Sequence, residues 1–149
     1  MRRFSIFLGI LFFVAVAAGA YAQTSPTIVT PSQLKWSSAG PSGISMAVVT
    51  GNPNAAGTYV VRLKMNPGAK FPVHTHGMDE RVTILQGNLL VGIGPKWNNA
   101  SMKAYPAGTY AIIPAGVPHY VMAKDAVIVE VTGQGPFTTK MMGGGKPGM

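Results

Sequence analysis

Hydrophobic and polar residues alternate with a period of two from Ile44 onward, which is typical of strands with one buried face. The segment 59–65 is the clearest case, because every second residue is large and apolar. Strands are predicted over residues 44–48, 59–65, 80–86, 89–93, 110–113, 119–123 and 126–131. Turns rich in Gly, Pro and Asn separate them, and outside the N-terminus no stretch carries the apolar stripe of an amphipathic helix. The pattern predicts an all-β fold, either a sandwich or a small barrel.

The first 22 residues have the pattern of an export signal. Two arginines follow Met1, residues 6–20 are almost entirely apolar, and Ala20-Tyr21-Ala22 has the small-x-small pattern of a cleavage site. The apolar run is short for a membrane span, so we expect cleavage after Ala22 and no membrane attachment afterwards. The protein would then be periplasmic or secreted, through either the Sec or the Tat route.

The remaining chain is predicted to contain one domain. Residues 23–43 are rich in Ser, Thr and Pro and are expected to form an extended N-terminal arm with at most one short strand. Residues 44–139 form the predicted domain, and the Gly- and Met-rich residues 140–149 are expected to be a flexible tail. The chain has no cysteine, so packing and metal must stabilise it. The formal net charge is +8, but the lysines are scattered, which argues against nucleic acid as a partner.

All three histidines of the chain lie in two short segments. His74 and His76 are two residues apart, so on a strand both side chains point to the same face. Glu80 follows a turn at residues 77–79, and His119 follows a second turn at residues 114–116. Three imidazoles and one carboxylate form a mixed nitrogen and oxygen site that leaves coordination positions open for substrate, water or dioxygen. Glu80 is interpreted as the fourth ligand; the alternative is a catalytic acid or base that orients bound water.

These two segments resemble the motifs of the cupin family. Residues 68–87 fit the pattern G-x5-H-x-H-x3-E-x6-G, and residues 108–119 fit G-x5-P-x-G-x2-H at every fixed position. Ala123 stands where many cupins have Asn, which affects the lining of the pocket and not the metal ligands. The resemblance implies a jelly-roll β-barrel with one divalent metal per chain, and commonly a homodimer.

Further residues are predicted to shape a substrate pocket. Val82 and Ile84 share the inward face of a strand with Glu80, and Val121 shares that of His119. Met78 lies beside the ligands and is expected at the mouth of the pocket. Trp97 lies in a polar loop and is the candidate for an exposed stacking platform.

The predicted function is that of an exported, metal-dependent oxidoreductase that activates dioxygen or peroxide. Copper or iron is favoured as the metal, and manganese, nickel and zinc also suit the ligands. The substrate is either a polysaccharide cleaved oxidatively, as in copper-dependent secreted enzymes, or a small phenolic or diketone, and the expected export favours the polysaccharide. The alternatives are a non-catalytic protein that binds metal or a small ligand, and a metal-dependent isomerase or lyase.

Overall fold

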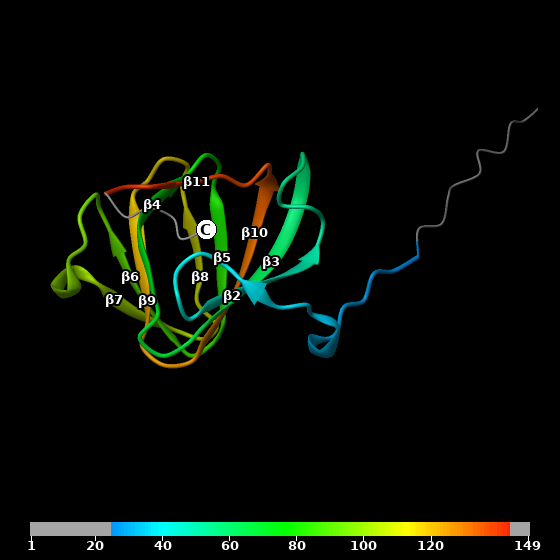
Figure 1. The fold of residues 1–149 in the computed structure, drawn as a ribbon, viewed down its shortest axis with the longest axis horizontal. Helices are drawn as coiled ribbons and strands as arrows, with labels where there is room; N and C mark the ends of the chain where they lie inside the picture. Colours follow the sequence, from blue (N-terminus) through cyan, green and yellow to red (C-terminus); the bar gives the residue numbers. More distant parts are fainter. Residues whose placement is uncertain (1–24, 144–149) are drawn as a thin grey trace, which may run out of the picture.

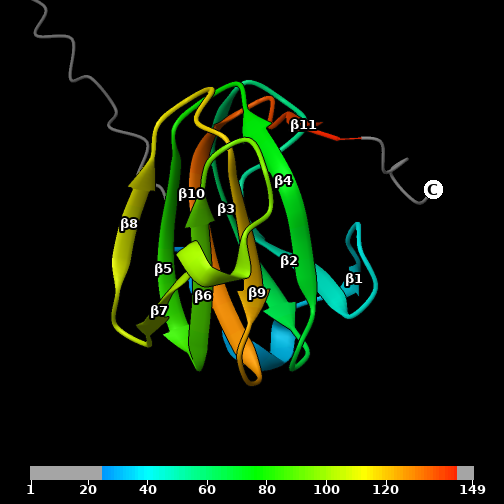
Figure 2. The same cartoon turned by 90° about the vertical axis from the view of Figure 1, so that its left-hand side faces the viewer.

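The computed structural model describes residues 25–143, which form two antiparallel β-sheets packed face to face (Figures 1 and 2). One sheet has the strand order β1-β2-β3-β10-β5-β8. Its strands are β1 (Ser37–Ser38), β2 (Ile44–Thr50), β3 (Gly57–Met65), β10 (Val127–Gly135), β5 (Glu80–Gln86) and β8 (Tyr110–Ile113). The other sheet has the order β11-β4-β9-β6-β7. Its strands are β11 (Thr139–Met141), β4 (Lys70–His76), β9 (His119–Ala123), β6 (Asn88–Ile93) and β7 (Lys103–Pro106).

The all-β prediction is therefore confirmed, and each strand predicted from the alternation is present. The sequence pattern did not indicate β7, because its four residues are all exposed and do not alternate in hydrophobicity. The structure also contains two short 3₁₀ turns, η1 (Pro31–Gln33) and η2 (Asn99–Ser101). Within residues 25–143, no helix is long and apolar enough to cross a membrane.

The core lies between the two sheets and is built by the inward residues of the alternating strands. In the central strand β10, Val131 pairs with Val61 of β3 on one side and with Val82 of β5 on the other. All three valines are buried. Burying a side chain of this size contributes roughly 1.5–3 kcal/mol each, so this row stabilises the six-stranded sheet and fixes its register.

A glycine makes the turn that carries the chain from one sheet to the other. Gly87 lies between β5 and β6 with a φ of 78°, a backbone conformation that other residues rarely adopt. A Cβ at this position would also overlap the carbonyl oxygen of Ala126. The glycine that ends the first sequence motif is thus required by the backbone.

The ends of the domain differ in detail from the predicted boundaries. In the predicted arm, β1 pairs with β2, so the end of the arm belongs to the sheet. The predicted tail begins at Lys140, but β11 covers Thr139–Met141 and pairs with β4, so the sheet extends into the first residues of that tail. The correction arises because backbone pairing with an edge strand requires no hydrophobic side chains. The predicted signal peptide and residues 144–149 lie outside the described residues.

Candidate metal centre

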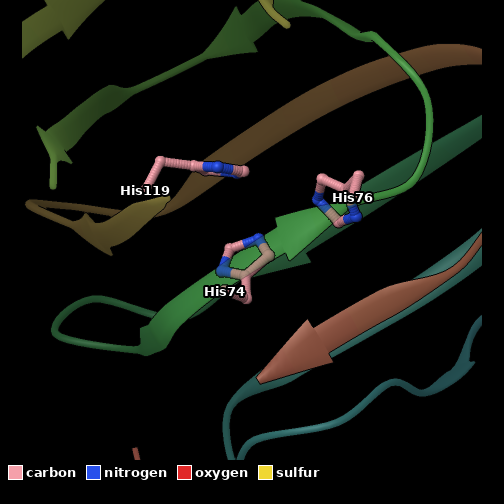
Figure 3. Close-up of side chains that lie close together, drawn as sticks. All are labelled: His74, His76 and His119. Atoms are coloured by element: carbon pink, nitrogen blue, oxygen red, sulfur yellow. The ribbon is translucent and has the colours of Figure 1, made fainter. Parts of the chain in front are cut away.

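The three histidines predicted as ligands converge between the sheets (Figure 3). His74 and His76 lie on β4, and His119 is the first residue of β9. One ring nitrogen from each histidine lies within 4.8 Å of the other two. The side chains are buried, with relative exposures of 4%, 7% and 1% for His74, His76 and His119. The structure thus brings together the three residues that the sequence spacing singled out.

Strand pairing places these residues. His74 lies opposite His119 in the antiparallel pairing of β4 with β9. The register of this pair shifts between Phe71 and His74, in the stretch that contains Pro72. Proline cannot donate a ladder hydrogen bond, which is why such irregularities occur at proline. After the shift, both Phe71 and His74 line the interior, although they are three residues apart.

The second motif is tied to the first by hydrogen bonds that backbone amides donate at the turn before β9. The amide of Gly116 donates to the carbonyl of His76 at 2.9 Å, and the amide of Ala115 donates to Oδ1 of Asp79 at 3.0 Å. These bonds hold the start of β9, and with it His119, beside the end of β4. The turn residues of both motifs thus position ligands.

Each imidazole is oriented by a hydrogen bond from Nδ1 to a backbone carbonyl. The acceptors are Pro72 for His74 at 2.7 Å, Thr138 for His76 at 3.1 Å and Val117 for His119 at 3.0 Å. A carbonyl oxygen only accepts, so Nδ1 carries the proton in each ring. Nε2 is then the atom with a free lone pair, as required of a neutral metal-binding histidine.

Glu80 begins β5 and turns its carboxylate toward these rings. Its Oε2 lies 3.3 Å from Nε2 of His119, and its Oε1 lies 3.6 Å from Nε2 of His76. The side chain is buried. A carboxylate facing imidazole lone pairs in a buried site requires a positive charge between them, either a proton or a metal ion. This position suits both roles predicted for Glu80, a ligand or an acid/base group beside the ligands.

Ionisation of these groups favours metal binding. Burial, together with the neighbouring His119, lowers the pKa of His74 to about 4. Burial also lowers the pKa of His76. For Glu80, burial alone would raise the pKa, but the interactions with His119 and His76 outweigh it and the pKa is lowered. At neutral pH His74 and His76 are thus held as neutral imidazoles and Glu80 as a carboxylate, the protonation states that bind divalent metal ions.

The residues fit a metal ion. Among the described residues, Nε2 of His76 is a buried polar atom without a hydrogen-bond partner, which is costly unless another species binds it. Three imidazole nitrogens with an adjacent carboxylate suit iron, copper, nickel, zinc or manganese.

The centre opens into a cavity of about 650 Å³ between the sheets. Val82, Ile84 and Val121 line it from the inward faces expected of them, and most of the other lining side chains are apolar. Ligand sites commonly have this size and character. A second group of lining residues is exposed: Ile93, Lys103, Tyr105, Tyr110 and Ile112.

This exposed group marks the opening of the cavity. β7 is the last strand of one sheet and β8 is the last of the other, and both lie on the left in Figure 2. Ile112 and Tyr110 of β8 are 52% and 57% exposed although they line the cavity. Ile93, which pairs with His119, is 59% exposed. Ile93 shares the inward face of β6 with Leu89 and Val91, but the sequence does not reveal which strands end the sheets.

Two predicted substrate residues lie elsewhere. Met78 is 49% exposed and lies in a separate shallow depression with Asp79 and Arg81. Trp97 packs against Tyr120, with ring centroids 4.8 Å apart, and Lys70 lies over its ring. Neither Met78 nor Trp97 lines the metal-site cavity. The predictions of a mouth residue and a stacking platform at this site are corrected: Met78 is exposed in the turn between β4 and β5, and Trp97 lies in the loop after β6, where it packs on Tyr120 of β9.

A jelly-roll sandwich with a three-histidine cluster of this spacing defines a cupin. The chain belongs to the family described as the ChrR cupin-like domain, whose model matches residues 24–138. It is similar to auxin-binding protein ABP19b from Prunus persica, with 30% identity over 112 residues that cover 67% of this chain and 54% of that protein. The chain thus spans about half the length of this curated relative.

Solved structures show the same fold at low identity. An RmlC-like cupin from Shewanella frigidimarina has a TM-score of 0.59 and 19% identity, covering 74% of this chain and 91% of that chain. The polyketide cyclase RemF from Streptomyces resistomycificus has a TM-score of 0.65 and 16% identity, covering 80% of this chain and 89% of that chain. These similarities establish the cupin fold.

Proposed function

We propose that this cupin binds one divalent redox metal through His74, His76 and His119 and oxidises a small molecule in the adjoining cavity. The observation that carries the proposal is the orientation of three buried imidazoles, each with Nδ1 bonded to a carbonyl and Nε2 free to bind metal. Copper or iron is the proposed metal. When bound, such a metal would supply Lewis-acid and redox chemistry toward dioxygen or peroxide.

Glu80 is the proposed acid/base residue of the site and a candidate fourth ligand. Its carboxylate lies beside two of the three histidines, and its side chain faces the cavity. In this position it can accept a proton from a substrate hydroxyl or hold a water molecule in place. The apolar walls would exclude bulk water and strengthen these interactions.

The burial of the ligands favours a small substrate over a polysaccharide. A polymer chain would need an exposed metal, whereas the three histidines lie at the inner side of a cavity lined by Val82, Ile84 and Val121. Such walls suit an aromatic or aliphatic body with few polar groups. We therefore favour a small phenolic, diketone or similar apolar molecule among the substrates considered.

Lys103 indicates the charge of the substrate that the cavity would bind. It lines the cavity from the edge strand β7 and is exposed at the opening. Apart from Glu80, the acidic side chains of the described residues have other partners than Lys103. Asp79 lies 3.9 Å from Arg81, Asp125 accepts a hydrogen bond from Asn88, and Glu130 pairs with Arg62. An ammonium at the mouth of an apolar cavity suits a substrate that carries an acidic group, such as a carboxylate or phenolate.

Metal analysis combined with oxygen consumption tests the proposal. Protein purified from its native compartment should contain stoichiometric copper or iron and should consume dioxygen or peroxide with small apolar acids or phenols, and not with soluble cellulose. Electron paramagnetic resonance should report nitrogen ligation. Bound zinc without oxidant consumption would instead support the metal-dependent isomerase or the non-catalytic binding protein. Export and a homodimeric state are separate proposals, tested by N-terminal sequencing and by light scattering.

A further inference from the structure

His76 differs from the other two histidines in what orients its ring. His74 and His119 donate to carbonyls only two residues earlier on their own segments, Pro72 and Val117. His76 instead donates to the carbonyl of Thr138, which lies 62 residues later in the chain. The hydroxyl of Thr139 is also 3.3 Å from Nδ1 of His76. One ligand is therefore oriented by a distant segment, and the other two are oriented locally.

This segment, residues 137–141, crosses the end of the sandwich as a strap and includes β11 (Figure 1). β11 pairs with the ligand strand β4, so that Thr139 lies opposite His76 and Met141 lies opposite His74. The ring of Phe137 stacks on the ring of His76, with centroids 4.7 Å apart and an interplanar angle of 30°. The strap thus contacts His76 through backbone pairing, a hydrogen bond to the ring and an aromatic stack.

The β11 part of the strap is weakly anchored compared with the strand it touches. β11 has three residues and lies at the edge of its sheet, where only β4 pairs with it. Thr139 and Lys140 are exposed. Phe137 anchors the start of the strap: its ring packs against the core and Tyr59, and its amide donates to the carbonyl of Pro53 at 2.6 Å. Short, exposed edge elements open at low free energy without global unfolding.

We propose that docking of the strap onto β4 sets the metal affinity of the site by positioning His76. With the strap docked, three imidazoles are oriented for one ion; with the strap detached, His76 loses its hydrogen bond and its stacking partner, and two oriented imidazoles remain. The coupling is reciprocal, so bound metal stabilises the docked strap. Phe137 and Thr138 act as positioning residues. The proposal rests on the metal-binding part of the proposed function and is independent of the reaction.

A matched pair of variants at the centre of β11 tests this coupling. Lys140→Pro removes a backbone N–H and disfavours the strand, whereas Lys140→Ala removes the same charge and keeps the backbone. Zinc affinity, measured by competition with a chelator, should fall about 10–100-fold in Lys140→Pro, the usual effect of losing a group that orients a ligand. It should be unchanged in Lys140→Ala. With Cu(II), electron paramagnetic resonance should show a changed nitrogen coupling pattern in Lys140→Pro and an unchanged one in Lys140→Ala.

A second measurement needs no substitution. Hydrogen exchange of the amides in residues 138–142 should slow when zinc is added to the purified protein, while exchange in the central strand β10 should change little. Equal affinities for the two variants, or strap exchange unaffected by zinc, would overturn the coupling and leave the metal centre intact. Failure of the unsubstituted protein to bind zinc or copper would overturn both proposals. If metal binding and strap docking are coupled but no substrate is oxidised, only the proposed oxidoreductase activity is overturned.

Discussion

His74 lies opposite His119 in the pairing of β4 with β9, and their ring centroids are 4.1 Å apart. Residues that are paired across a sheet are held by backbone hydrogen bonds on both strands. These two ligands therefore belong to rigid elements and not to loops. A site built in this way is preorganised, so little conformational entropy is lost when the metal binds.

Replacing one of these ligands should abolish tight metal binding. His119→Ala removes a nitrogen from the set of three, and the expected loss of zinc or copper affinity exceeds about 100-fold, more than a residue that only orients a ligand would cause. Val121→Ala is the matched control, because Val121 lies on the same strand and lines the same cavity but offers no ligand atom. Chelator competition and metal content measure the effect. Retention of one metal per chain in His119→Ala would refute the assigned ligand set.

The metal-free protein should lose stability as the pH falls from about 6.5 to 4. In the folded state burial lowers the pKa of His74 to about 4, while the unfolded chain takes up this proton near 6.5. Between these values protons bind more strongly to the unfolded chain, so acid shifts the equilibrium toward unfolding. His74 alone would contribute up to about 3 kcal/mol, since one pKa unit is worth 1.36 kcal/mol.

Urea titrations of the metal-free protein at several pH values test whether the free energy of unfolding falls as the pH falls. His74→Gln, which cannot titrate, should show a smaller loss of stability over the same range. The lowered pKa of His76 acts in the same direction, so some dependence should persist in the variant. A free energy of unfolding that rises from pH 7 to pH 5 would contradict the buried, neutral state of these imidazoles.

Lys103 should select anionic ligands at the cavity opening. The probes are 2-naphthoate and 2-naphthamide, which have nearly the same shape and differ in charge. The protein should bind the acid more tightly than the amide, and Lys103→Met should weaken binding of the acid roughly fivefold, as expected for a partly exposed charge pair of about 1 kcal/mol. Lys96→Met, an exposed lysine that does not line the cavity, is the control. If Lys103→Met still binds the acid more tightly than the amide, the carboxylate of the acid would bind the metal and not Lys103.

The sequence predicted the strands and the ligand cluster because both depend on local spacing. Alternation defines which residues face inward, and the His74-x-His76 spacing places two rings on one face whatever the rest of the fold. The role of Trp97 could not be predicted in this way. An aromatic residue in a polar loop is expected to be exposed, but here the loop folds back so that Trp97 packs on Tyr120.

Long-range pairing accounts for the other missed features. Nothing in the composition of residues 137–141 indicates contact with His76, because the contact is made by a backbone carbonyl that every residue possesses. The opening of the cavity depends on β7 and β8 being edge strands, which strand order determines and local pattern does not. In the sequence Lys103 is one of many scattered lysines, and only the register of β7 places it in the lining.

Gly92 should be intolerant of any side chain because it pairs with Tyr120 across β6 and β9. Tyr120 is fully buried, and a Cβ on Gly92 would overlap its ring. The ring cannot move freely, since its hydroxyl lies 2.9 Å from Oγ of Ser101 and also bonds the backbone of Asn98. Overpacking of this kind costs roughly 1–3 kcal/mol, so Gly92→Ala should lower the free energy of unfolding by at least that amount.

A double-mutant cycle separates this steric effect from a loss of backbone freedom. Tyr120→Leu removes the overlapping part of the ring, so Gly92→Ala should cost less in that background than in the unsubstituted protein. Tyr120→Phe keeps the ring and removes the hydrogen bonds, so Gly92→Ala should remain costly there, while the loss of the hydroxyl itself should cost about 1 kcal/mol. Urea unfolding of the single and double variants measures each free energy. If Gly92→Ala cost as much in the Tyr120→Leu background as in the unsubstituted protein, the ring would not be the cause, since only contact between the two side chains makes their effects depend on each other.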